Sequence, residues 1–150
     1  QEALETEISR VGRTGDTLCA IMADLDHFKL VNDELGHATG DKVLARFGAL
    51  LRSHTRSTDV VARYGGEEFV VLLPHTSLAQ ATAKAEQIRV ALAAETIKPL
   101  ARPVTASFGV VELGEQEDAV SFLSRVDAAM YQAKDAGRNR VVRTGASAET

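Results

Sequence analysis

Four acidic side chains stand in two pairs where the sequence is otherwise apolar. Asp24 and Asp26 follow the apolar run 18–23, and Glu67 and Glu68 precede a second apolar run. Carboxylate oxygens are the protein ligands that Mg²⁺ prefers, and phosphate groups often supply the rest. Because side chains alternate along a strand, we expect only one aspartate and one glutamate to meet at a metal. Taken alone, each pair is more typical of a solvated strand end or turn.

Basic residues follow the first acidic pair and recur near the C-terminus. If residues 27–29 open a helix, their backbone N–H groups favour phosphate at the positive end of the helix dipole, and Lys29 adds a mobile charge. Lys134 and Arg138 belong to a stretch, 134–143, with four basic residues and one acidic residue. The alternatives are a surface lysine near a helix cap and cations placed favourably at a helix C-terminus.

Asn32, His37 and Asp41 form a third polar group within residues 32–41, where one predicted helix ends and a second begins. A carboxylate accepts two parallel N–H bonds, and the edge of guanine offers such a pair. Capping of the second helix by Thr39 or Asp41 is the alternative, and for Asp41 it is a strong one.

Hydrophobic periodicity predicts the elements that position these groups. Helices are expected over residues 1–13, 27–35, 39–54, 78–92 and 122–133, and strands over residues 18–23, 60–64, 68–73, 104–111 and 141–142. Gly65 and Gly66 predict a hairpin, and they leave room for a ligand to approach the backbone. Gly137 closes the last helix, and residues 144–150 are expected to fray. Hairpins combined with helical crossovers predict an α/β (α+β) fold, a mixed sheet with helices against it.

Composition limits the class of protein. The chain has 150 residues, which predicts a single domain over 1–150. Hydrophobic residues make up 45% and charged residues 25%, as in globular proteins. The net charge of −4 argues against binding duplex nucleic acid through bulk charge. The single cysteine, Cys19, excludes a disulfide framework within the chain and fits a reducing compartment.

Other familiar signals are missing from the sequence. No apolar run approaches the length of a transmembrane helix, and the acidic N-terminus does not resemble a secretory signal. The serine-nucleophile elbow, the P-loop and the dinucleotide fingerprint do not occur. One cysteine and four scattered histidines argue against a zinc site.

Several ordered motifs nevertheless match one known family. Residues 24–33 (DLDHFKLVND), Gly36-His37, Gly40-Asp41 and residues 63–69 (RYGGEEF) resemble the GGDEF domain of bacterial diguanylate cyclases, here in its GGEEF form. Residues 107–110 (SFGV) and 131–139 (YQAKDAGRN) continue the resemblance, which runs from about residue 17 to residue 143. Ordered motifs at compatible spacing are far more specific than any one alone.

The resemblance implies a fold and a reaction. The family has a palm-like, ferredoxin-related mixed sheet of about five strands surrounded by helices, similar to nucleotidyl cyclases. Its members condense two GTP molecules into cyclic di-GMP and release two pyrophosphates. The 3′-oxygen of one nucleotide attacks the α-phosphorus of the other, a step that metal ions assist.

The resemblance also implies roles for individual residues. Metal ligands would be Asp24, Glu67 and the carbonyl of Leu25, holding Mg²⁺ or Mn²⁺, with two ions per site. Glu67 and Glu68 are tied to activation of the 3′-hydroxyl. The substrate-binding residues would be His27, Phe28, Lys29, Asn32, His37, Asp41, Lys134 and Arg138, and Lys29 also counts among the catalytic residues.

A second copy of the chain is the implied partner. The product is two-fold symmetric, so two protomers would each present one GTP to the other in a pair expected to be weak for this domain alone. Arg56 and Asp59 resemble the family's R-x-x-D inhibitory site for cyclic di-GMP, a pattern that could otherwise be a helix-end arginine and a strand-leading aspartate. A second arginine often supports that site, and Gln87 stands at the equivalent position here.

The resemblance leaves two further expectations and one rival reading. The start motif that often precedes the family's first helix is missing, so we expect a trimmed domain without its regulatory partner. GTP chemistry places the domain in the cytoplasm, although a full-length protein could be anchored in a membrane. The rival is a catalytically silent module that binds cyclic di-GMP or a protein; Asp24, Lys29 and the intact GGEEF motif argue against it.

Overall fold

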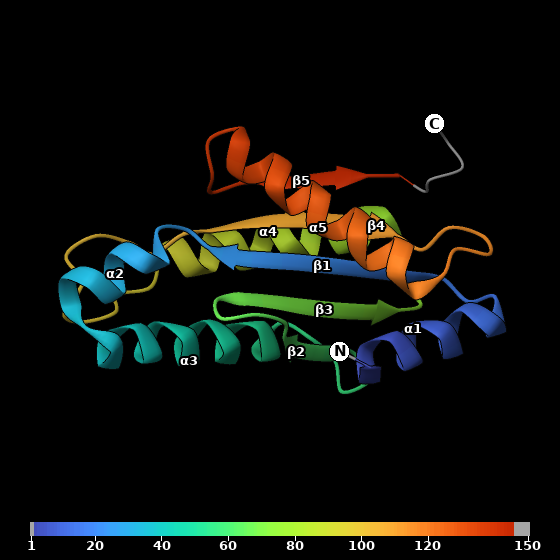
Figure 1. The fold of residues 1–150 in the computed structure, drawn as a ribbon, viewed down its shortest axis with the longest axis horizontal. Helices are drawn as coiled ribbons and strands as arrows, with labels where there is room; N and C mark the ends of the chain where they lie inside the picture. Colours follow the sequence, from blue (N-terminus) through green and yellow to red (C-terminus); the bar gives the residue numbers. More distant parts are fainter. Residues whose placement is uncertain (1, 146–150) are drawn as a thin grey trace.

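The computed structural model describes residues 2–145, and these form one mixed sheet flanked by helices (Figure 1). In chain order the elements are α1 (Glu2–Thr14), β1 (Leu18–Leu25), α2 (Phe28–Leu35), α3 (His37–Ser53), β2 (Val60–Arg63), β3 (Glu68–Pro74), α4 (Leu78–Ala93), β4 (Ala106–Glu112), α5 (Ala119–Asp135) and β5 (Val141–Thr144). Each predicted helix and strand is present, with ends shifted by a few residues. The predicted fraying over 144–150 falls outside the described residues, except that Thr144 ends β5 and residue 145 follows it.

The strand order is β2-β3-β1-β4-β5. β1 pairs antiparallel with β3 and β4, β2 pairs antiparallel with β3, and β4 pairs parallel with β5. The connections β1-α2-α3-β2 and β3-α4-β4 each skip one strand, which is the split βαβ arrangement of ferredoxin-like sheets. The predicted fold class is therefore confirmed.

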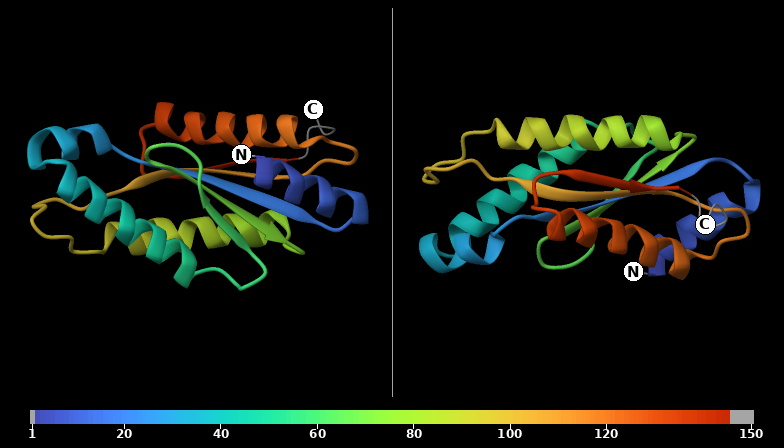
Figure 2. Two further views of the ribbon diagram at one scale, coloured as in Figure 1. Left: turned by 60° about the horizontal axis from the view of Figure 1, so that its bottom comes forward. Right: turned by 90° about the horizontal axis from the view of Figure 1, so that it is seen from above.

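Two hydrophobic cores lie on opposite faces of the sheet (Figure 2). α3 and α4 pack on one face, against Cys19, Ile21, Ala23 and Leu25 of β1. α1 and α5 pack on the other face, against the alternate side chains of β1. Because both faces of β1 are covered, its sequence is continuously apolar until Asp24. The first acidic pair is consequently fixed to the most buried strand of the molecule.

Gly109 sets how closely α5 approaches the sheet. A Cβ atom at this position in β4 would lie 2.4 Å from the backbone nitrogen of Met130 and 2.6 Å from the carbonyl oxygen of Val126. Only glycine permits this contact, and the contact brings the last turn of α5 over the end of β1. Among the described residues, no helix combines the length and apolarity needed to cross a membrane.

Candidate active site

The two acidic pairs meet at one end of the sheet. Asp24 stands opposite Glu68 in the β1–β3 register and opposite Ser107 in the β1–β4 register. The Leu25 N–H lies 3.4 Å from the carbonyl oxygen of Glu67, which ties the hairpin tip to the end of β1. Residues more than forty positions apart thereby form one acidic group.

Asp26 is a structural junction. Its Oδ1 accepts a hydrogen bond from Ser107 Oγ at 2.7 Å, and its Oδ2 accepts from Thr105 Oγ1 at 2.8 Å and from the Asn139 N–H at 3.0 Å. The expectation that Asp24 and Asp26 diverge is wrong, because side chains two residues apart return to the same face of a strand. The two aspartates differ in their hydrogen bonds and not in the direction of their side chains. Asp26 already accepts three hydrogen bonds, so Asp24 is the one with spare acceptor capacity.

Lys134 joins the two aspartates from α5. Its Nζ lies 3.0 Å from Asp24 Oδ1 and 3.6 Å from Asp26 Oδ1, and its side chain is only 15% exposed. The contact with Asp24 is an ion pair without hydrogen-bond alignment, since that oxygen has no aligned donor. Lys134 therefore packs into the cluster of acidic side chains as their counter-ion, and is not simply a solvated cation at a helix end.

One lysine does not neutralise all the acids gathered here. Burial, together with a hydrogen bond and charge repulsion from Asp24, raises the pKa of Glu67 to about 7. Burial and the Asp24 charge also raise the pKa of Glu68, and the same two causes raise the pKa of Asp127 on α5. The site holds an excess of negative charge that a bound cation would offset.

The donor set fits a hard divalent ion held with its substrate. Asp24 and Glu67 supply carboxylate oxygens, and Mg²⁺ is usually held by one or two carboxylates together with waters and phosphates. Within residues 2–145, no three His, Cys, Asp or Glu side chains converge as a ready-made cage. The arrangement thus suits an ion that arrives with phosphate ligands more than a permanent structural metal.

A cavity of about 430 Å³ opens beside the hairpin tip, between α2 and α3. Its lining residues are Phe28, Lys29, Asn32, His37, Asp41, Leu44, Arg63, Gly66 and Glu67. Asn32 Oδ1 is buried without a hydrogen-bond partner, so a ligand donor in this cavity would satisfy it. A Cβ atom at Gly40 would lie 1.9 Å from that oxygen, so glycine is required there for Asn32 to keep its position.

The capping alternative for Asp41 is wrong. α3 begins at His37 with Gly36 at its N-cap, which puts Thr39 and Asp41 inside the helix. Asp41 instead lines the cavity together with Asn32. The structure therefore brings Asn32, His37 and Asp41, the third polar group of the sequence, to the same cavity.

The start of α2 borders the same region. His27 adopts a left-handed conformation (φ 58°) at the N-cap and makes no side-chain capping bond, and the helix begins at Phe28. The Lys29 side chain is 89% exposed and lies 3.9 Å from Asp33. A weak surface ion pair of this kind leaves the ammonium group available to a ligand.

Arg138 lies just beyond the helix that carries Lys134. α5 ends at Asp135, close to the helix end predicted at Gly137. Arg138 follows in a left-handed turn (φ 66°), where its N–H donates to the carbonyl oxygen of Ala133 at 2.9 Å. The position of the Arg138 Cα atom is therefore set by this turn and not by the helix.

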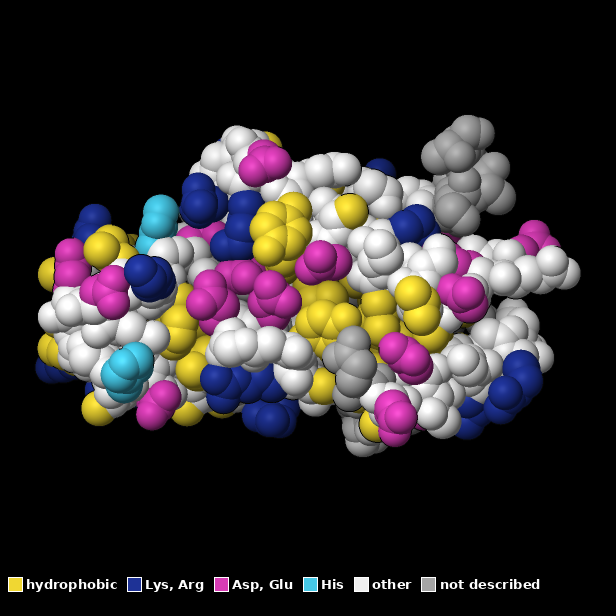
Figure 3. Space-filling model, in the orientation of Figure 1, with side chains coloured by type: hydrophobic (Ala, Val, Ile, Leu, Met, Phe, Trp, Pro, Cys, Tyr) yellow, Lys and Arg dark blue, Asp and Glu magenta, His cyan; other side chains and the backbone are white. Residues whose placement is uncertain are grey.

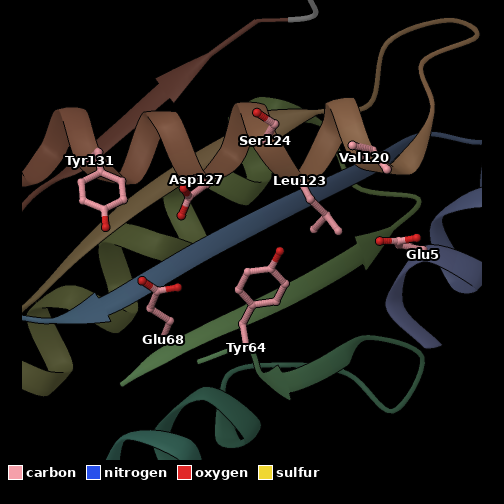
Figure 4. Close-up of a pocket in the computed structure, with 8 residues that line it drawn as sticks. All are labelled: Glu5, Tyr64, Glu68, Val120, Leu123, Ser124, Asp127 and Tyr131. Atoms are coloured by element: carbon pink, nitrogen blue, oxygen red, sulfur yellow. The ribbon is translucent and has the colours of Figure 1, made fainter. Parts of the chain in front are cut away.

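A second cavity, of about 360 Å³, lies on the α5 side of Glu68 (Figure 4). It is lined by Glu5, Tyr64, Glu68, Val120, Leu123, Ser124, Asp127 and Tyr131. Figure 3 shows acidic side chains gathered at the middle of this face, beside exposed hydrophobic ones and between groups of lysine and arginine. Sequence reasoning missed Asp127 and did not single out Tyr131. The signal was the spacing of Asp127, Tyr131 and Lys134, which are four and then three residues apart and so lie on one helix face.

The Arg56–Asp59 pattern forms a compact network at the other end of β3. Arg56 Nη2 lies 3.1 Å from Asp59 Oδ1 and donates to the carbonyl oxygen of Pro74 at 2.9 Å and to Thr76 Oγ1 at 3.0 Å. The Arg56 N–H also donates to Asp59 Oδ2 at 2.8 Å. The pattern is thus a folded unit with both side chains held in place.

The fold and site together define a palm-like domain with carboxylates at the edge of its sheet. A family profile described as "Diguanylate cyclase, GGDEF domain" matches residues 1–140. The chain belongs to the GGDEF domain family. It is 43% identical over 142 residues to diguanylate cyclase DgcP of Pseudomonas aeruginosa, which covers 93% of this chain and 21% of DgcP. Response regulator PleD of Caulobacter vibrioides is 41% identical over 144 residues, covering 93% and 32% of the two chains.

Solved structures agree with this assignment. The active GGEEF domain of a diguanylate cyclase from Vibrio cholerae superimposes with a TM-score of 0.88 at 33% identity, over 95% of each chain. The GGDEF domain of DgcB from Caulobacter crescentus, in complex with c-di-GMP, gives a TM-score of 0.89 at 33% identity, over 95% of this chain and 86% of that one. The chain spans only about a fifth of DgcP and a third of PleD.

Proposed function

We propose that this chain is the catalytic domain of a diguanylate cyclase, which condenses two GTP molecules into cyclic di-GMP and releases two pyrophosphates. The observation that carries the proposal is the meeting of Asp24, Glu67 and Glu68 beside a cavity with a buried, unpartnered amide oxygen. Membership of the GGDEF family supports the same reaction.

Guanine binds in the cavity between α2 and α3. Asp41 accepts two N–H bonds from the base edge, and Asn32 contributes the acceptor that has no partner within the protein. His37 lines the opening. Because buried polar groups are normally paired, a base that donates to Asn32 is preferred over one that cannot.

The triphosphate lies between the start of α2 and the end of α5. The backbone at His27, Phe28 and Lys29 presents N–H groups at the positive end of the α2 dipole. Lys29 supplies a mobile charge, and Lys134 and Arg138 supply charge from the other side. Their placement offsets phosphate charge although the chain as a whole is acidic.

Asp24, Glu67 and the Leu25 carbonyl are the groups that would hold Mg²⁺ or Mn²⁺, with two ions at each site. When bound, the ions supply charge neutralisation at the leaving pyrophosphate and lower the pKa of the attacking hydroxyl. Glu68 accepts the 3′-hydroxyl proton as the 3′-oxygen bonds to the α-phosphorus and the bond to pyrophosphate breaks. Its raised pKa suits a group that must bind that proton.

Two copies of the chain face each other during the reaction. Each protomer holds one GTP, and the two-fold symmetry of the product matches an isologous pair. The pair forms transiently for this domain alone, and a regulatory segment in the whole protein would raise its population. The reaction takes place in the cytoplasm, where GTP is available.

Cyclic di-GMP also binds at Arg56 and Asp59 as an inhibitor. Arg56 presents guanidinium donors suited to guanine or phosphate, and its pairing with Asp59 holds it ready for a ligand. Gln87 stands where a second arginine often supports this site, so inhibition is weaker than in relatives that carry it. Arg89 does not substitute, because Glu86 and Asn139 engage its guanidinium.

Incubation with GTP and Mg²⁺, followed by mass analysis of the products, tests the reaction. We expect cyclic di-GMP and pyrophosphate, at a rate that rises more steeply than protein concentration. A fusion to a dimeric coiled coil should raise the rate at low concentration. Binding of added cyclic di-GMP without any synthesis, even by the fusion, would instead identify the silent signalling module.

A further inference from the structure

The turn after α5 holds three consecutive residues at positive φ. Gly137, Arg138 and Asn139 have φ values of 128°, 66° and 48°. Asparagine tolerates this region, but an arginine there is conformationally strained. Strained backbone of this kind persists only where the surrounding contacts hold it.

Contacts from two other elements hold the turn. The Asn139 N–H donates to Asp26 Oδ2 at 3.0 Å, and Asn139 Oδ1 accepts from Arg89 Nη1 at 2.9 Å. Asp26 directly follows β1, whereas Arg89 lies on α4, which packs on the opposite face of the sheet from α5. Asn139 therefore links the turn that follows α5, on one face of the sheet, to α4 on the other face.

Arg89 is itself fixed in orientation. Its Nε donates to Glu86 Oε1 at 2.9 Å and its Nη2 donates to Glu86 Oε2 at 2.6 Å. A planar guanidinium bound through two of its nitrogens directs the third toward a defined point. That third nitrogen meets Asn139, and the Arg89 side chain is only 22% exposed.

We propose that Arg89 is a positioning residue for the triphosphate site. Through Asn139 it fixes the left-handed turn that carries Arg138, and through the Asn139–Asp26 bond it supports the aspartate that Lys134 contacts. Arg89 reaches neither the acidic group nor the cavity between α2 and α3. This inference rests on the proposed function, in which Arg138 and Lys134 bind phosphate.

The variant Arg89→Met tests this role by removing the guanidinium while keeping the length of the side chain. We expect the KM for GTP to rise roughly 10-fold and kcat to change less than about twofold, because ground-state phosphate binding is weakened. Lys84→Gln is the matched control, since it removes a positive charge from α4 at a residue with no contact to the turn. Its KM should equal that of the unmodified chain.

Hydrogen exchange of the Asn139 amide provides a readout that does not need activity. In Arg89→Met this amide should exchange at least about 10-fold faster, with unchanged exchange in the core of β1. Arg89→Lys should give intermediate values, because an ammonium group cannot serve Glu86 and Asn139 with the same geometry.

The outcomes separate the two proposals. If the unmodified chain makes no cyclic di-GMP, the proposed function fails, and GTP affinity measured by calorimetry replaces KM. If Arg89→Met and Lys84→Gln show the same KM and the same Asn139 exchange, the role of Arg89 is refuted. A global loss of exchange protection in Arg89→Met and Arg89→Lys alike would make Arg89 a residue for stability and also overturn the proposal.

Discussion

Acidic side chains lie beside both ends of β3, but their charge is balanced by a basic partner at only one of them. At the end near Pro74, Asp59 is 2% exposed and has its charge matched by Arg56 at 3.1 Å. At the end near Glu68, one lysine serves two aspartates, and the pKa values of both neighbouring glutamates are raised. The same strand thus joins a satisfied ion pair to a crowded group of carboxylates.

The difference teaches how each end is built to meet a ligand. The Arg56 end is organised by its own contacts, so the proposed cyclic di-GMP ligand would meet a guanidinium that is already oriented. The Glu68 end keeps an excess of negative charge that only a bound cation can offset. Without that cation, the repulsion among these carboxylates reduces the stability of the folded state. Stability given up at a site in this way is a common sign of function.

Removing the proton acceptor should give the largest effect. Glu68→Gln keeps the size of the side chain but cannot accept the 3′-hydroxyl proton, so turnover should fall by roughly 1,000-fold or more. Mass analysis of product from GTP and Mg²⁺ measures the loss, and circular dichroism checks the fold. Glu115→Gln, at an exposed loop residue, is the control and should retain full turnover. Comparable rates for the two variants would contradict the role of Glu68.

Two glycines separate the needs of the site from those of the fold. A Cβ atom at Gly66 would meet nothing within 4 Å and φ there is not positive, so Gly66→Ala should leave the melting temperature unchanged. Turnover should still fall roughly 10-fold to 100-fold, because the added methyl group enters the space where the substrate approaches the hairpin. Gly109→Ala is the opposite case, since its Cβ would lie 2.4 Å from backbone, and it should destabilise the fold. Equal melting temperatures for the two variants would refute this distinction.

The sequence predicted the helices and strands and most of the residues that gather at the candidate site, but not Asp127. Periodicity predicted β1 and the hairpin, and the acids follow directly after them. The sequence did not reveal that the carboxylate oxygens of Asp26 are taken up by hydrogen bonds, because the donors at Thr105, Ser107 and Asn139 come from distant segments. The left-handed conformation of Arg138 was equally hidden, since contacts with other elements impose it against local preference.

Mutation at the Arg56 end should change inhibition by the product and not the basal rate of turnover. Arg56→Ala removes the guanidinium donors, so the cyclic di-GMP concentration that halves the rate should rise at least about 10-fold. Turnover without added product should change little, because the residue lies at the far end of β3 from Glu68. Rates measured across a product titration test this expectation. Gln87→Arg sharpens it, since a second arginine should tighten inhibition severalfold. If Arg56→Ala is still inhibited at the same cyclic di-GMP concentration as the unmodified chain, the assignment of Arg56 and Asp59 as the inhibitory site is refuted.

The smallest effect concerns the stability of the metal-free domain. Folding raises the pKa of Glu67 from about 4.5 to about 7, so the folded chain binds the proton more tightly than the unfolded chain does. Stability should therefore decrease as pH rises between these two values and then level off. The full shift corresponds to about 3 kcal/mol, and solvent screening at this partly exposed side chain reduces it to about 1 kcal/mol.

Glu67→Gln removes the titrating group and should flatten this dependence. At about pH 8 in chelator, the variant should be about 1 kcal/mol more stable than the unmodified chain, whereas near pH 4.5 the two should match. Urea unfolding at both pH values measures the difference. Excess Mg²⁺ should reduce the advantage, because an ion bound by the folded state stabilises the chain that keeps its carboxylate. A gain of the same size at both pH values would mean that packing, and not charge, sets the cost of Glu67, and the contrast between the two ends of β3 would then lose its electrostatic basis.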